Sequence, residues 1–133
     1  MTTFDRVRVR HYVTSSQHYL ENALALLQLG EAAKASEFFW GSVAEAIQAV
    51  AVWRGTHLAN HRSLRYWAAT IAKELNDPTI NEGFVIAERL HSNFHEVELD
   101  AVDVATVAET IRRTVAKLLA IIPPEALEEA SPS

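Results

Sequence analysis

The sequence predicts an all-α protein, a five-helix antiparallel up-and-down bundle. Apolar residues recur at helical spacing through five segments, and the alternation typical of a strand occurs only at residues 6–10. The connections between the segments are short, which favours antiparallel neighbours. At 133 residues, the chain is long enough to form one domain around its own core.

The first predicted helix covers residues 16–29, with an apolar stripe of leucine and alanine. Ser15 or Ser16 can cap its N-terminus, because a side-chain hydroxyl can accept a bond from a free backbone N–H. Gly30 suits the left-handed position that often follows a helix.

The second predicted helix, residues 31–54, carries apolar stripes on two sides, so we expect it to be central in the bundle. Gly55 is placed to end it. The third helix covers residues 61–75. Asp77 and Pro78 end it, because a residue before proline is disfavoured in the helical conformation.

The fourth predicted helix covers residues 79–95 and opens with Thr79 and Glu82 at the spacing of a capping box. The fifth covers residues 102–122, and Asp100 is its candidate N-cap. Each of these helices has one apolar stripe, which the bundle would bury.

The pattern divides the chain into an N-terminal basic arm at 1–15, a helical bundle at 16–122 and an acidic flexible tail at 123–133. The arm is either extended or the start of a helix. The net charge is −5 and unevenly spread, positive over the first half and negative over the second. We therefore expect no DNA binding and confine any RNA contact to a local patch.

Composition excludes several classes of site. The chain has no cysteine, which excludes disulfides, thiolate-bound zinc and cysteine nucleophiles. No apolar run approaches the roughly 20 residues that span a bilayer, and the N-terminus lacks an apolar signal core. We expect a cytoplasmic protein that binds no membrane and no cofactor.

The most informative stretch is residues 87–96, which crowds Arg89, two imidazoles and an amide into a helix. Its Leu-His-x-Asn-Phe-x-Glu part contains His91, Asn93 and Phe94, and it resembles the archaeal PaREP-type branch of the HEPN helical superfamily. The alanine-rich second helix, with Phe-Trp-Gly at its start, resembles the same family. The resemblance implies a helical bundle that often forms a homodimer.

Arg89 and His95 are the candidate catalytic pair. Their spacing fits the Arg-x(4 to 6)-His pattern that the resemblance associates with metal-independent RNA cleavage. A histidine can move a proton and a guanidinium can hold a phosphate. On a straight helix, however, the two side chains lie about 120° apart. Leu90 also stands where active members commonly have a polar residue.

His91 falls on the predicted apolar stripe of the fourth helix, together with Ala87 and Phe94. A buried imidazole must be hydrogen-bonded, so we interpret His91 as a structural histidine that joins this helix to a neighbour. Asn93 would then secure the helix end or the loop that follows it. On this interpretation His91, Asn93 and Phe94 form a structural motif.

Two spacings in the sequence are typical of metal ligands. His91 and His95 have the i,i+4 spacing of metal ligands, as do His57 and His61, but this spacing alone is a weak signal. Glu88 and His91 have the spacing found in di-iron bundles, but the chain has no second copy of the Glu-x-x-His pair. We therefore assign no metal site.

A basic patch surrounds the loop between the second and third helices. Arg54, His61, Arg62 and Arg65 are its candidate phosphate-binding residues, since three of them lie near the positive end of a helix dipole. The alternative is a solvated loop whose arginines pair with acids of the fourth or fifth helix.

Two functions remain open. The first is a non-catalytic or weakly active interaction or ligand-binding module associated with RNA or nucleotides. The alternative is a toxin-like, metal-independent ribonuclease in which Arg89 and His95 meet across a dimer interface. The resemblance also implies candidate partners: a second copy of the chain, and a cognate nucleotidyltransferase or antitoxin.

Overall fold

The computed structural model describes residues 4–96 and 99–128, and these are almost entirely helical. Five α-helices and one short 3-10 helix follow one another along the chain: α1 (Arg6–Gln28), α2 (Ala32–Trp53), α3 (His61–Glu74), α4 (Pro78–Glu96), α5 (Ala101–Leu119) and η1 (Pro124–Leu127). No strand occurs within this described part, and residues 6–10 are helical. The predicted all-α bundle is confirmed.

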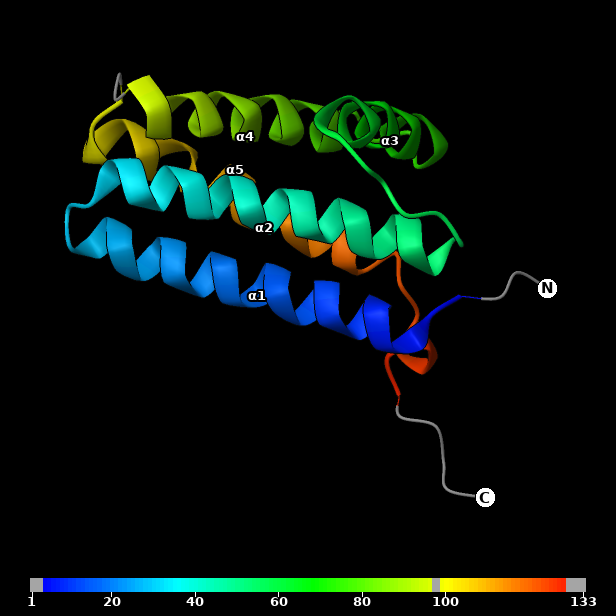
Figure 1. Cartoon of the computed structure of the whole chain (residues 1–133). Helices are drawn as coiled ribbons and strands as arrows, with labels where there is room; N and C mark the ends of the chain where they lie inside the picture. Colours follow the sequence, from blue (N-terminus) through cyan, green and yellow to red (C-terminus); the bar gives the residue numbers. More distant parts are fainter. Residues whose placement is uncertain (1–3, 97–98, 129–133) are drawn as a thin grey trace.

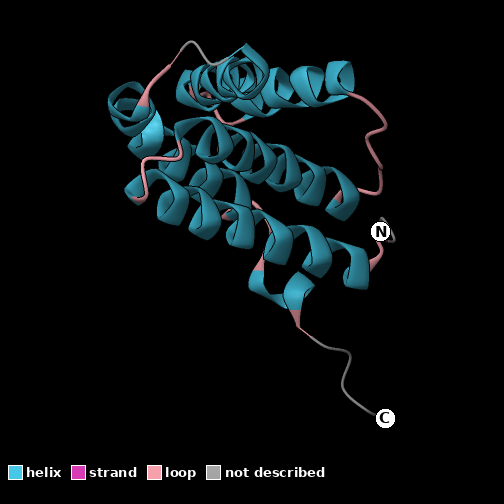
Figure 2. Cartoon of the chain, turned by 60° about the vertical axis from the view of Figure 1, so that its left-hand side comes forward, coloured by secondary structure: helices cyan, strands magenta, loops and turns pink. Residues whose placement is uncertain are grey.

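Four helices run side by side in alternating directions, and one does not (Figure 1). Helices α1 and α2 form an antiparallel hairpin, and so do α4 and α5. Helix α3 lies across the end of α4, as both views show (Figures 1 and 2). The up-and-down order therefore holds for four helices, while α3 is a crosswise connection between α2 and α4.

Helix α2 is central, as its two apolar stripes predict, and it packs against α1, α3, α4 and α5. The small residues of α2 permit α1 to approach it closely. Ser16 of α1 donates its hydroxyl to the Ser42 carbonyl oxygen at 2.7 Å, and Ser42 returns a bond to the Ser16 carbonyl oxygen at 2.8 Å. Both serines are fully buried, so this reciprocal pair satisfies polar groups that burial would otherwise penalise.

The start of the first helix differs from the prediction. Helix α1 begins at Arg6 instead of at residue 16, and Asp5 caps it by accepting the Arg8 backbone N–H at 3.0 Å. Val9 and Val13 lie one turn apart and are buried in the core, which extends the helix into the predicted basic arm. Neither Ser15 nor Ser16 is the cap.

The predicted tail also begins differently. Residues Pro124–Leu127 form η1 against α1, with Ala126 buried, and Arg6 Nη1 donates to the Glu125 carbonyl oxygen at 2.8 Å. Residues 129–133 of the predicted tail and 1–3 of the predicted arm lie outside the described residues.

Other helix ends follow the local signals. Asp100 caps α5 in a reciprocal capping box with Asp103, and both Gly30 and Gly55 have positive φ just after their helices, as predicted. The start of α4 differs: Pro78 is its first residue, and Asp77 accepts the Thr79 N–H, so Thr79 is not the cap. Proline is well suited to a first helical position, where its missing N–H costs nothing.

The buried side of α4 also differs from the predicted stripe near its C-terminus. Leu90 and Asn93 are buried, whereas Phe94 is 40% exposed. The loop before α5 returns over the Asn93 side of the helix. Tertiary contact therefore decides which residue of the last turn is covered.

No helix in residues 4–96 and 99–128 is long and apolar enough to cross a membrane.

Candidate functional site

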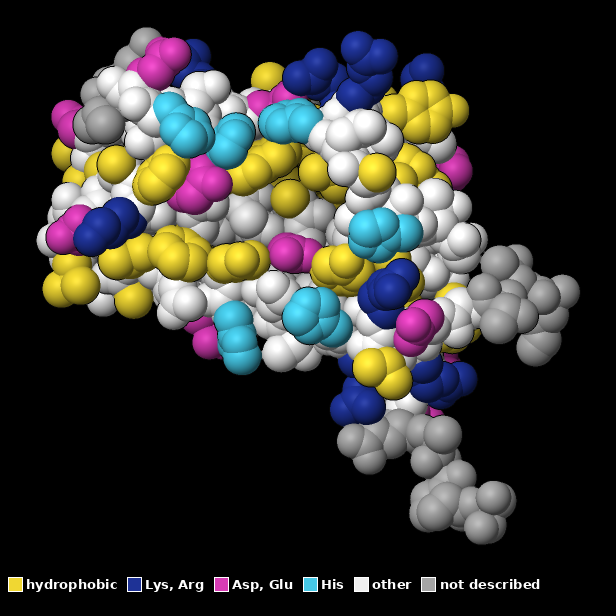
Figure 3. Space-filling view, in the orientation of Figure 1, with side chains coloured by type: hydrophobic (Ala, Val, Ile, Leu, Met, Phe, Trp, Pro, Cys, Tyr) yellow, Lys and Arg dark blue, Asp and Glu magenta, His cyan; other side chains and the backbone are white. Residues whose placement is uncertain are grey.

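Histidines gather on one face of the molecule, next to acidic side chains (Figure 3). Part of this surface is built where α2, α3 and α4 meet. We call this part the histidine face, and its members are Glu37, Trp40, His61, Arg65, Glu88, His91 and His95.

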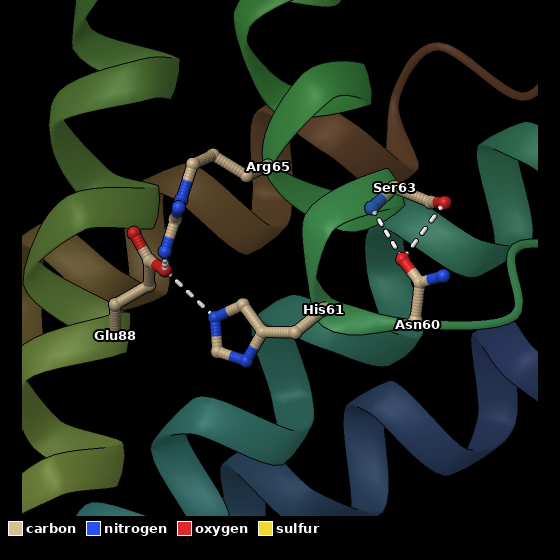
Figure 4. Close-up of polar contacts among 5 residues, drawn as sticks. All are labelled: Asn60, His61, Ser63, Arg65 and Glu88. Atoms are coloured by element: carbon tan, nitrogen blue, oxygen red, sulfur yellow. Dashed lines mark hydrogen bonds and ion pairs between the residues drawn. The ribbon is translucent and has the colours of Figure 1, made fainter.

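His61 is the first residue of α3, and the local sequence sets its position. Asn60 caps this helix by accepting the Ser63 backbone N–H at 2.9 Å (Figure 4). The His61 imidazole stacks on the Trp40 indole, with ring centroids 4.6 Å apart and planes 17° apart. Its Nε2 lies 2.7 Å from Glu88 Oε2. The ring is thus held from two sides, by α2 and by α4.

Glu88 joins α3 to α4 through two partners (Figure 4). Arg65 Nη2 donates to its Oε2 at 2.5 Å, and His61 binds the same oxygen. Partial burial acts to raise the pKa of Glu88, but the hydrogen bonds from Arg65 and His61 outweigh it, so the pKa is lowered. Glu88 is therefore an anion at neutral pH and orients the His61 ring as its acceptor.

His91 makes a second carboxylate–imidazole pair, between α2 and α4. Its Nδ1 lies 2.8 Å from Glu37 Oε2. The His91 ring centroid is 5.2 Å from the Trp40 ring and 6.0 Å from the His61 ring. His91 is half-buried instead of lying in the core as predicted, and its bond to Glu37 joins α4 to α2.

Glu37, His91 and His95 also form a group that could hold a metal ion. One ligand atom from each residue lies within 4.8 Å of the other two. His95 is exposed, whereas Glu37 and His91 are half-buried. The His91 and His95 rings are 5.2 Å apart, edge to face.

Asn93 lies on a different side of α4, and all of its polar atoms are used. Its Nδ2 donates to Ser36 Oγ at 2.9 Å and to the Leu99 carbonyl oxygen at 3.3 Å. Its Oδ1 accepts the Leu99 N–H at 2.5 Å. The amide joins α4 to α2 and to the loop before α5, the role that we predicted for it. Phe94, the third residue of the predicted motif, is exposed and takes no part in these bonds.

Arg89 and His95 are not brought together within one chain. Helix α4 is continuous from Pro78 to Glu96. Arg89 is exposed and lines a pocket with Leu99 and Asp103, beside α5. His95 instead groups with Glu37 of α2. Positions six residues apart on a straight helix point about 120° apart around its axis, and this separates the two side chains.

Two arginines of the basic patch pair with two different carboxylates. Arg54 Nη1 pairs with Glu74 of α3 at 2.9 Å, and Arg65 pairs with Glu88 of α4. Arg62 is exposed, and no hydrogen bond or ion pair joins it to the rest of the described chain. Arg54 and Arg65 are therefore paired with carboxylates on two different helices, and the phosphate-binding role of the patch stays a prediction.

The sequence-based candidate sites do not include Glu37 or Trp40 of the histidine face. They include Glu88 in a different role. Trp40 belongs to an apolar stripe of α2 and is buried, and Glu37 lies about one turn before it. Glu88 was considered only as a di-iron ligand. Nothing in their local sequence pairs these side chains with histidines of α3 and α4, because the pairs join residues far apart in the chain.

Fold and site together define a helical bundle that carries oriented imidazoles at a junction of three helices. The model of the archaeal PaREP1/PaREP8 family matches residues 11–115, and the chain belongs to this family. No curated protein and no solved structure matches the chain. The wider resemblance to the HEPN superfamily stays a prediction.

Proposed function

We propose that this protein is a non-catalytic ligand-binding module and that the histidine face is its binding surface. The carrying observation is that two imidazoles, His61 and His91, are each held by a carboxylate from another helix and each contact Trp40. Such side chains lose little conformational freedom when a ligand binds, so the surface is preorganised.

The local charge indicates which ligands this face suits. Glu37 and Glu88 contribute two negative charges and Arg65 one positive charge, which leaves a net charge of −1 when the imidazoles are neutral. A phosphate would be repelled by this arrangement, and a cation would be attracted. The association with RNA or nucleotides that the resemblance implies stays a prediction. A nucleotidyltransferase or antitoxin partner also stays a prediction.

The ribonuclease alternative requires two subunits. Arg89 lies beside α5 and His95 lies beside α2, so one chain presents them on different sides of α4. A composite site would need a dimer that brings Arg89 of one subunit to His95 of the other. The ribonuclease hypothesis is therefore tested as a site shared by two subunits.

The deciding experiment measures cleavage of single-stranded RNA by the purified chain in a buffer that contains EDTA. We expect no cleavage above background, and no change in Arg89→Ala or His95→Ala. Arg113→Ala is the matched control, because Arg113 is exposed on α5 and outside the motif. Metal-free cleavage that disappears in both motif variants, with unchanged circular dichroism, and that persists in the control would overturn the proposal.

A further inference from the structure

We propose that Glu37, His91 and His95 bind one divalent transition-metal ion, with zinc as the best match. The proposal rests on the histidine face being a binding surface, and it names the chemical class of the ligand. Its first support is that the three residues offer ligand atoms within 4.8 Å of one another.

The spacing fits coordination by one ion. Zinc binds nitrogen and oxygen ligands at about 2.1 Å, so neighbouring ligands of a tetrahedral site lie about 3.4 Å apart. The Glu37–His91 contact of 2.8 Å is shorter than this spacing, and the limit of 4.8 Å is longer. The ligands would therefore shift on binding, and His95 is exposed, so its side chain can turn toward the other two.

The residue types select the metal. Two imidazoles and one carboxylate form an N₂O set, which suits zinc and other late divalent transition metals. Calcium and magnesium prefer sites made of oxygen ligands, so neither matches a site with two histidines. Three protein ligands also leave a coordination position open for water or another ligand.

The secondary structure supports the same set. His91 and His95 are four positions apart on α4, so their side chains project from the same side of the helix, one turn apart. Glu37 reaches them from α2, and the Trp40 ring packs beside His91. The ion would replace the hydrogen bond between His91 Nδ1 and Glu37, and the neutral imidazole would then carry its single proton on Nε2.

The simpler explanation of the cluster is a Glu37–His91 hydrogen bond with His95 beside it by chance. The two explanations differ at His95, which makes no hydrogen bond or ion pair within the described residues. Removing its imidazole would leave the Glu37–His91 bond intact and would remove one metal ligand. His95 therefore gives the most direct test.

The experiment is calorimetric titration of the full chain with zinc chloride after removal of metals by a chelator. We expect one zinc ion per chain. Loss of an outer-shell partner alone weakens metal sites about 10- to 100-fold, so His95→Ala and Glu37→Gln should each weaken binding at least about tenfold. His18→Ala is the matched control, because His18 is an exposed histidine of α1 outside the cluster, and we expect its affinity to be unchanged.

A second measurement reports coordination directly. With Co²⁺ in place of zinc, a site of low coordination number gives strong visible absorption, which His95→Ala should remove. Absence of zinc binding by the wild-type chain, or equal affinity in wild type and His95→Ala, would overturn the metal site. If the Co²⁺-loaded chain shows only the weak absorption of six-coordinate Co²⁺, the metal site is also overturned.

The two proposals fail separately. The RNA assay contains EDTA and does not depend on metal, so RNA cleavage there would overturn the non-catalytic module whatever zinc does. A failed zinc titration with no RNA cleavage would remove the metal site and leave the binding module in place.

Discussion

Asn93 shows how much a single buried amide contributes to this fold. Only 3% of the residue is exposed, and its amide holds α4, α2 and the loop before α5 together. The backbone N–H and C=O of Leu99 both depend on it. Leu99 lies outside the helices, so its backbone groups obtain these partners from a side chain, which explains why the amide is buried.

We predict that Asn93→Ala lowers the free energy of unfolding by about 2 kcal/mol, because it leaves polar groups of Leu99 without their partner. Urea denaturation followed by circular dichroism measures the change. Ser92→Ala, at the exposed neighbouring position, is the control and should change stability by less than about 0.5 kcal/mol. Equal midpoints for the two variants would show that the amide does not hold the loop.

At the scale of elements, a close approach of α4 and α5 depends on a glycine. A Cβ atom added to Gly83 would lie 2.8 Å from both the Cβ and the Cγ2 of Thr114. Rotation of the Thr114 side chain cannot move its own Cβ, so the helices would have to separate. Gly41 on α2 is less tightly packed, since its added Cβ would meet the Tyr19 ring at 3.2 Å.

We predict that Gly83→Ala destabilises the protein by about 1–3 kcal/mol, because overpacking outweighs the roughly 1 kcal/mol gained in helix propensity. Gly41→Ala is the matched control, and we expect a change between zero and a small stabilisation. Thermal or urea unfolding measures both. In a double-mutant cycle, Thr114→Ala should recover part of the loss in Gly83→Ala. Equal stability of the two glycine variants would contradict the close approach.

At the scale of the whole molecule, the homodimer implied by the family resemblance stays a prediction. Phe94 is a large apolar residue of the family-marking segment, and its exposure leaves it free to contact a second copy. Val85 is also exposed on α4, but nine residues earlier, which places it about 180° around the helix.

We expect light scattering at micromolar concentration to give twice the 14.8 kDa chain mass. Phe94→Ser should lower this mass, since it removes apolar surface from the predicted interface, whereas Val85→Ser should leave it unchanged. A monomeric wild-type chain would contradict the dimer. A dimer that tolerates Phe94→Ser would place the interface on another surface.

The fold class, the central place of α2 and most helix ends can be predicted from the amino-acid sequence alone. These features follow from local rules: apolar spacing selects the helix and its buried side, Asp100 caps a helix, and Gly30 and Gly55 adopt positive φ after one. The resemblance carried by residues 87–96 also led to the family to which the chain belongs.

The tertiary structure decided which side chains meet. Helix α1 begins at Arg6 because Val9 and Val13 are buried in the core, and Asn93 replaces Phe94 inside because Leu99, just after α4, returns to bond its amide. The pairs of the histidine face join three helices, and no local pattern records which carboxylate reaches which imidazole. Periodicity specifies the direction of a side chain on its own helix, whereas its neighbours depend on how the helices pack.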